Sequence, residues 1–104
     1  MNTKLIRINQ IKKDQKGVLC YGHFNTIHPG HIRYLKYAAS QSDNLYLALI
    51  GDGNNINEKN FEFSQSDRAE SLSLLKMINS IVLLENDEID EVVPLLRPYL
   101  LILG

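Results

Sequence analysis

The sequence predicts an α/β domain in which helices cover both faces of a parallel sheet. Short apolar runs alternate with longer segments whose apolar residues recur at helical spacing, in the order β-α-β-α-β-α-β. The apolar runs lack polar alternation, which is typical of strands that are buried on both faces. This order favours right-handed crossovers and a three-layer α/β/α arrangement.

The composition favours a single soluble domain. The chain has 104 residues, enough to bury roughly two-thirds of its unfolded surface. A formal net charge of −1 argues against nucleic-acid binding, which usually requires a basic excess. The lone Cys20 lies in an apolar run and is expected to be a core residue of a cytoplasmic protein. We expect neither a secretory signal nor a membrane span, because Met1–Lys16 is polar and no apolar run approaches ~20 residues.

The first strand is expected at Val18–Tyr21, and the first helix from Pro29 to about Ser40. Proline suits the first helical position, where its missing N–H costs nothing. Residues 1–16 precede this unit as an N-terminal extension, in which Leu5–Ile11 could form a short extended piece and a helical turn. The domain itself is predicted over residues 17–104.

The second strand is expected at Leu45–Ile50. Turn-forming residues then predict a loop from Asn54 to Phe63. Ser64 or Ser66 can cap a helix over Asp67–Met77, whose apolar residues share one face.

The third strand is expected at Ile81–Leu84, followed by a helical segment over Asn86–Leu96. Its acidic residues cluster near the start, where the helix dipole favours them and where we expect solvent exposure. Pro94 is expected to break the segment into two short pieces, and Pro98 forbids its continuation. The fourth strand is Tyr99–Gly104. Since a covering helix normally follows such a strand, we expect a domain truncated after its fourth core strand.

The most specific feature is a run of ten residues between the first strand and the first helix. It reads Gly22-His23-Phe24-Asn25-Thr26-Ile27-His28-Pro29-Gly30-His31. The first amides of a helix lack partners within the helix, and its dipole favours anions. His28 and His31 add two imidazoles on one side of the first turn, an arrangement suited to phosphate oxygens. Ligands of parallel sheets bind at the carboxyl ends of the strands, where this segment lies.

This decapeptide resembles the G-x-F-D-x-x-H-x-G-H signature of the cytidylyltransferase-like nucleotidyltransferases. Glycerol-3-phosphate cytidylyltransferase and the heptose-phosphate nucleotidyltransferase domains look most similar. The resemblance continues at Lys59, at Asp67–Leu72 and at Leu95–Tyr99. It implies a Rossmann-like fold and the transfer of CMP or AMP from CTP or ATP to a sugar or polyol phosphate. It also implies release of pyrophosphate, assistance by Mg²⁺ and a homodimer.

The resemblance implies that His28, His31 and Lys59 are the catalytic residues. The two histidines would donate hydrogen bonds to oxygens of the α- and β-phosphates as charge develops. Lys59 would place a point charge at the β- and γ-phosphates. No metal site is assigned to side chains of the protein.

A further set of residues is implied to bind the nucleotide. These residues are Tyr21, Gly22, Phe24, Asn25, Gly30 and Arg68. Gly30 would let the backbone approach the phosphates, and Phe24 would anchor the loop in the core. Arg68 could contact phosphate or hold the loop. Asn25 replaces the aspartate of the signature, and a neutral amide is a poorer ligand for Mg²⁺.

The main hypothesis is therefore an enzyme that takes a nucleoside triphosphate and a small phosphorylated acceptor, with no nucleic-acid or membrane partner. The alternative is a noncatalytic nucleotide-binding or assembly module of a larger protein. It is motivated by Asn25 and by the family's downstream Ser/Thr-rich motif, which this sequence lacks. A small zinc-binding module is a third possibility, because histidines three apart can share a metal ion.

Overall fold

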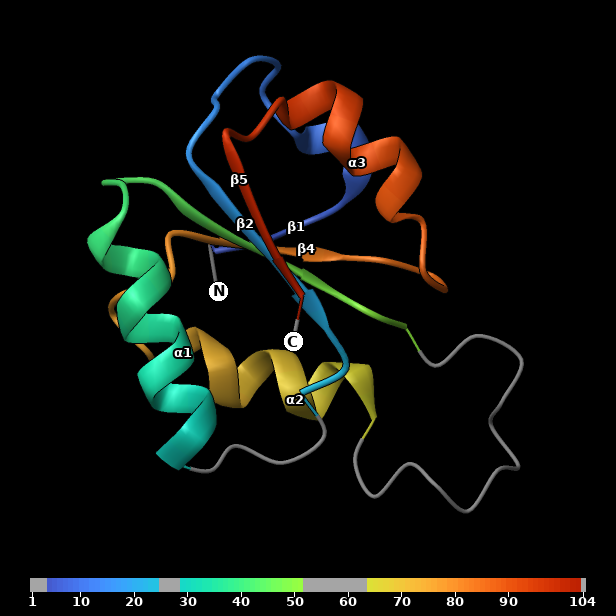
Figure 1. The fold of residues 1–104 in the computed structure, drawn as a ribbon. Helices are drawn as coiled ribbons and strands as arrows, with labels where there is room; N and C mark the ends of the chain where they lie inside the picture. Colours follow the sequence, from blue (N-terminus) through green and yellow to red (C-terminus); the bar gives the residue numbers. More distant parts are fainter. Residues whose placement is uncertain (1–3, 25–28, 52–63, 104) are drawn as a thin grey trace.

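The computed structural model of the protein describes residues 4–24, 29–51 and 64–103. Its elements are, in order, β1 (Leu5–Ile6), the 3₁₀ helix η1 (Ile8–Gln10), β2 (Val18–Gly22), α1 (Pro29–Ser40), β3 (Leu45–Leu49), α2 (Gln65–Ser73), β4 (Ser80–Leu83), α3 (Ile89–Leu96) and β5 (Leu100–Leu103). The strands form one parallel sheet in the order β1-β4-β3-β2-β5. Helices α1 and α2 cover one face, and α3 with η1 covers the other (Figure 1). The predicted three-layer Rossmann-like α/β/α fold is confirmed.

Strand β2 lies inside the sheet, and the strand order reverses beside it. Val18 pairs with Leu45 of β3 on one side and with Leu100 of β5 on the other. After β2, the chain adds β3 beside β2 and then β4 beside β3. It then passes through α3 on the opposite face of the sheet and adds β5 on the other side of β2. In open α/β sheets, ligands bind in the crevice beyond the carboxyl ends at such a switch point.

The alternation of side chains along the strands divides the core into two layers. Under α1 and α2, Cys20 and Leu47 pack with Leu35 and Leu72 of those helices. On the opposite face, Leu19 belongs to the layer that packs against α3. Val18, Leu19 and Cys20 are all fully buried, which explains why this run is continuously apolar.

The N-terminal segment adds an edge strand to the same sheet. Leu5 pairs with Ile81 and Ile6 with Val82 of β4, and η1 follows directly. The expected extended piece and helical turn are therefore confirmed. The backbone N–H groups of Asp14 and Lys16 then donate to carbonyls near the end of α3. The domain boundary after residue 16 stays a prediction.

Helix α2 has one of the two expected caps, but it begins at Gln65 rather than Asp67 and ends earlier than expected. Ser64 is its N-cap, with Oγ accepting from the Asp67 N–H at 3.2 Å. The predicted end at Met77 is wrong, because the helix ends at Ser73. The amide of Leu75 bonds three residues back rather than four, which tightens the chain so that Ile78 enters the core with no exposed surface.

Helix α3 begins later than expected and is a single helix. The Glu88 carboxylate accepts from the backbone N–H groups of Glu85 and Asn86, which holds a turn ahead of the helix and moves its start from Asn86 to Ile89. The predicted break at Pro94 is wrong. Since the first four helical N–H groups have no intrahelical partner, a proline at the sixth residue removes only one bond.

Cys20 is a core residue, as expected. Burial raises the pKa of its thiol to about 11, against a smaller opposing effect of a hydrogen bond with Tyr34. The Tyr34 hydroxyl donates to the Ile102 carbonyl at 2.8 Å, and burial together with the neighbouring thiol raises the pKa of its phenol. The pair connects β2, α1 and β5 in one buried contact.

The shifted thiol predicts a loss of stability in alkali. The thiol ionises near its ordinary pKa of 9.0 in the unfolded chain and near about 11 in the folded protein. The folded state therefore keeps its full stability below about pH 9 and loses part of it as the pH rises toward 11. By about pH 10.5 the loss from Cys20 should be about 2 kcal/mol in the free energy of unfolding. The free energy of unfolding, measured with urea across this pH range, should fall less steeply with pH in Cys20→Ala than in wild type. Identical slopes for the two proteins would contradict the expectation.

Candidate functional site

The predicted motif begins at the carboxyl end of β2, in the interior of the sheet. Gly22 is buried, and its carbonyl accepts from the Ile50 N–H at 3.0 Å. Phe24 has a φ of 53°, in the left-handed region that bulky residues rarely adopt. Its side chain is only 5% exposed, and its ring centroid lies 6.3 Å from that of Tyr34 on α1. Burial of the ring offsets the backbone cost, so Phe24 anchors the start of the motif in the core.

Arg68 fixes the same loop from the side of α2. The residue is 2% exposed, and its Nη1 donates to the carbonyls of His23 at 2.6 Å and Ile50 at 3.0 Å. Hydrogen bonds from a charged donor are stronger than neutral ones, so this contact holds the ends of β2 and β3 together. Of the two roles that the sequence left open, Arg68 performs the loop-holding one here, and a phosphate contact stays a prediction.

The electrostatic environment differs between the two faces of the sheet at this end of β2. On the α2 side, partial burial and then the charge of Arg68 lower the pKa of His23. On the α3 side, burial raises the pKa of Tyr21, and the carboxylates of Asp87, Asp90 and Glu88 raise it further. An anion is therefore favoured on the side of Arg68 and disfavoured beside Tyr21.

Gln65 is a contact residue that the sequence did not reveal. It lies three residues before Arg68, and its Nε2 donates to the carbonyls of Leu49 at 3.0 Å and Leu84 at 2.6 Å. Gln65 and Arg68 share a helix face only because α2 begins at Gln65, before the expected start at Asp67, and the carbonyls that they meet are distant along the chain. No local signal identified those partners.

Gly51, just after β3, lies directly against the backbone that follows β4. An added Cβ would lie 2.1 Å from the Glu85 carbonyl oxygen and 2.3 Å from that of Leu84, distances that real side chains essentially never show. The Gly51 N–H donates to the Asn86 carbonyl at 2.9 Å. Only glycine fits where the two backbones approach so closely.

Several predicted site residues cannot be compared with the structure. Asn25, His28 and Lys59 lie outside the described residues, as does the predicted loop of residues 54–63. Gly30 is exposed in the first turn of α1, and the backbone of His31 follows it in the same turn. The roles of these residues in binding or catalysis stay predictions.

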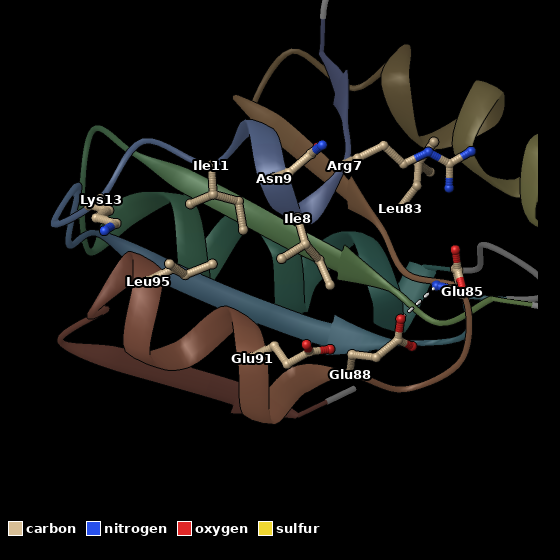
Figure 2. A pocket seen from close by; sticks show the side chains of 10 residues that line it. All are labelled: Arg7, Ile8, Asn9, Ile11, Lys13, Leu83, Glu85, Glu88, Glu91 and Leu95. Carbon is tan, nitrogen blue, oxygen red and sulfur yellow. Dashed lines mark hydrogen bonds between the residues drawn. The ribbon is translucent and has the colours of Figure 1, made fainter.

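A cavity of about 490 Å³ lies elsewhere, between η1, the end of β4 and α3 (Figure 2). Ile8 and Ile11 line it from the N-terminal segment, Glu91 and Leu95 line it from α3, and Glu88 lines it from the turn before α3. None of the predicted site residues lines it.

Metal-binding clusters and membrane-spanning helices are both absent from the described residues. In residues 4–24, 29–51 and 64–103, no three His, Cys, Asp or Glu side chains gather to hold a metal ion. No helix within the same ranges is both long and apolar enough to cross a membrane.

Known proteins resemble this chain over most of its length. A family model described as cytidylyltransferase-like matches residues 19–104. The bifunctional protein HldE of Aliarcobacter butzleri is 32% identical over 93 residues, which cover 86% of this chain and 20% of that protein. An FAD synthase of Methanothrix thermoacetophila is 32% identical over 87 residues, which cover 84% of this chain and 61% of that protein. The chain thus spans less than two thirds of the length of these curated relatives.

A solved structure has a similar arrangement in space. The lipopolysaccharide core biosynthesis protein of Thermoplasma volcanium superposes with a TM-score of 0.68 and 27% sequence identity. The match covers 83% of this chain and 71% of that chain.

Proposed function

Because the chain belongs to the cytidylyltransferase-like family, we propose that it transfers CMP or AMP from a nucleoside triphosphate to a phosphorylated sugar or polyol. The observation that carries the proposal is the position of the decapeptide. It leaves the carboxyl end of β2 beside the point where strand order reverses, and it leads into the first turn of α1. Phosphate groups are favoured at such a helix start.

In the proposed reaction, an oxygen of the acceptor phosphate attacks the α-phosphorus of CTP or ATP. The bond from the α-phosphorus to the bridging oxygen breaks, and pyrophosphate leaves with that electron pair. Such a transfer depends mainly on positioning and on stabilisation of the phosphate charge. His28 and His31 would donate to phosphate oxygens, while Lys59 would neutralise the leaving pyrophosphate.

The described residues support a phosphate site on the α2 side of β2. Gly30 is exposed in the first turn of α1, so its backbone is accessible to a ligand. The buried cation of Arg68 favours negative charge at the ends of β2 and β3. Tyr21, with its acidic neighbours, would lie on the nonphosphate side of the nucleotide.

Mg²⁺ would enter with the triphosphate as part of the substrate. Among the described members of the predicted site, Tyr21, Gly22, Phe24, Gly30 and Arg68, none carries a carboxylate. Mg²⁺ commonly retains waters and binds phosphate oxygens together with one or two carboxylates. Phosphate oxygens and water would therefore be its main ligands here. We further propose that the enzyme acts as a homodimer.

Calorimetric titration with Mg²⁺–CTP and, separately, Mg²⁺–ATP is the direct test. We expect one of them to bind, and we expect His28→Ala to lose that binding. Pyrophosphate release with glycerol 3-phosphate or a heptose phosphate would then establish the transfer. Binding without turnover of any sugar or polyol phosphate would favour the noncatalytic module, and binding of neither nucleotide would contradict the proposed site.

A further inference from the structure

We propose that Gln65 is a positioning residue of the nucleotide site. Its side-chain amide joins the carboxyl ends of β3 and β4 and thereby sets the position from which Arg68 holds the end of β2. The inference rests on the proposed function for its binding readout, and the contacts on which it rests are independent of that function.

The first step is an interruption in the ladder between β3 and β4. The two strands pair regularly up to Leu49 and Leu83, and the Leu84 N–H donates to the Leu49 carbonyl at 3.1 Å. A regular parallel ladder would continue with the Gly51 N–H donating to the Leu84 carbonyl. That N–H instead donates to the Asn86 carbonyl at 2.9 Å. The ladder therefore skips the Leu84 carbonyl.

The second step is the replacement of the missing donor. Gln65 Nε2 donates to the Leu84 carbonyl at 2.6 Å and to the Leu49 carbonyl at 3.0 Å. Leu84 has no exposed surface, so its carbonyl would be costly to leave without a donor. The Gln65 amide thus supplies the hydrogen bond that the backbone ladder does not give to the Leu84 carbonyl.

The third step is the coupling to Arg68. Gln65 and Arg68 are three residues apart on α2 and therefore lie on one face of the first turns of the helix. Their donors meet carbonyls of Leu84 after β4, of Leu49 and Ile50 at the end of β3, and of His23 after β2. One helix face therefore holds the carboxyl ends of three adjacent strands in a fixed arrangement.

The last step connects this arrangement to the ligand. The loop that Arg68 holds at His23 continues through the motif into α1. A small displacement of α2 would move the Arg68 charge and the start of that loop together. Because the attraction between the Arg68 charge and the nucleotide phosphates depends on their separation, nucleotide binding should respond to the loss of Gln65.

The experiment compares Gln65→Met, Gln65→Glu and the exposed neighbour Ser66→Ala as a matched control. The Kd for Mg²⁺–CTP and Mg²⁺–ATP would be measured by calorimetry on fully folded protein. Gln65→Met removes the donor at similar length and should raise the Kd of the bound nucleotide about tenfold at every pH. Ser66→Ala should leave it unchanged. An unchanged Kd in Gln65→Met would overturn the proposal.

The Gln65→Glu variant separates positioning from simple packing. Its carboxylate, when ionised, faces two carbonyl oxygens and cannot donate, whereas the protonated carboxyl can donate to one of them. The Kd of Gln65→Glu relative to wild type should therefore improve as pH falls from about 8 to about 5.5, while that of Gln65→Met should not. Parallel pH profiles for the two variants would contradict a role of the hydrogen bond.

Hydrogen exchange gives a readout that does not need nucleotide. Gln65→Met should raise the hydrogen-exchange rates of the Gly51 and Leu84 backbone amides about tenfold or more. The exchange rate of the Cys20 backbone amide in β2 should stay unchanged. If wild type binds neither nucleotide, the proposed function fails, and this exchange result alone decides whether Gln65 holds the strand ends. Unchanged exchange at Gly51 and Leu84 would overturn the inference even if nucleotide binds.

Discussion

Alanine at both His28 and His31 is expected to lower the rate of nucleotidyl transfer by at least about 10³-fold while leaving the fold intact. The proposed transition state gathers charge on phosphate oxygens, and each imidazole would stabilise that charge through a hydrogen bond. Removing one such donor commonly costs about 10² to 10³ in rate, so loss of both should leave little catalysis. Pyrophosphate release measures the rate, and thermal unfolding by circular dichroism measures the fold.

His23→Ala is the matched control for the pair of histidines. The His23 side chain is exposed and belongs to the same decapeptide, and it is the His23 backbone carbonyl that Arg68 holds. We expect its rate to stay within about threefold of wild type, because the substitution keeps the backbone carbonyl that Arg68 holds. Wild-type rates in the His28 and His31 double variant would refute the assigned mechanism.

Replacing Arg68 with methionine is expected to destabilise the fold by about 3 kcal/mol. The change removes two charged hydrogen bonds and leaves the partly buried carbonyls of His23 and Ile50 without that donor. Lysine at this position keeps the charge but lacks the planar guanidinium group with its several N–H donors. Arg68→Lys should therefore lower the free energy of unfolding about half as much as Arg68→Met. Urea unfolding measures the free energy directly.

Arg33→Met provides the comparison for Arg68, because Arg33 is exposed on α1. It should change the free energy of unfolding by less than about 0.5 kcal/mol. Equal losses in the two arginine variants would mean that the buried contacts of Arg68 contribute little. Where Arg68→Met remains folded at low temperature, its affinity for Mg²⁺–nucleotide should also fall, because the loop after β2 loses its tether.

The sheet was predictable because its information is local. Val18–Tyr21 and Leu45–Ile50 are continuous apolar runs, and strands buried on both faces require that pattern. Ser64 was predictable as a cap because its hydroxyl acts within one turn of the helix. Burial of Cys20 followed from its place in the first run.

The errors arose where distant or side-chain contacts override local preference. The end of α2 depends on how Ile78 enters the core, and the start of α3 depends on the Glu88 carboxylate folding back on two amides. Pro94 was expected to break a helix, but as the sixth of its eight residues it removes only one intrahelical hydrogen bond.

The candidate site was predictable as a motif and not as a set of contacts. The decapeptide identified the strand end and the helix start, both of which the structure confirms. The partners of Gln65 and Arg68 are main-chain carbonyls brought near by folding, and carbonyls carry no sequence signature. The roles of His28 and Lys59 stay predictions, since both lie outside the described residues.

The pairing of β1 with β4 has a consequence for the order of folding. Leu5 lies in β1, yet its partner Ile81 lies in β4, which follows only after β2, α1, β3 and α2. Contacts between residues so far apart in sequence slow folding, because the intervening chain loses conformational entropy before the strand pairing contributes stability. During synthesis, β1 must therefore stay without its partner strand until β4 has been made.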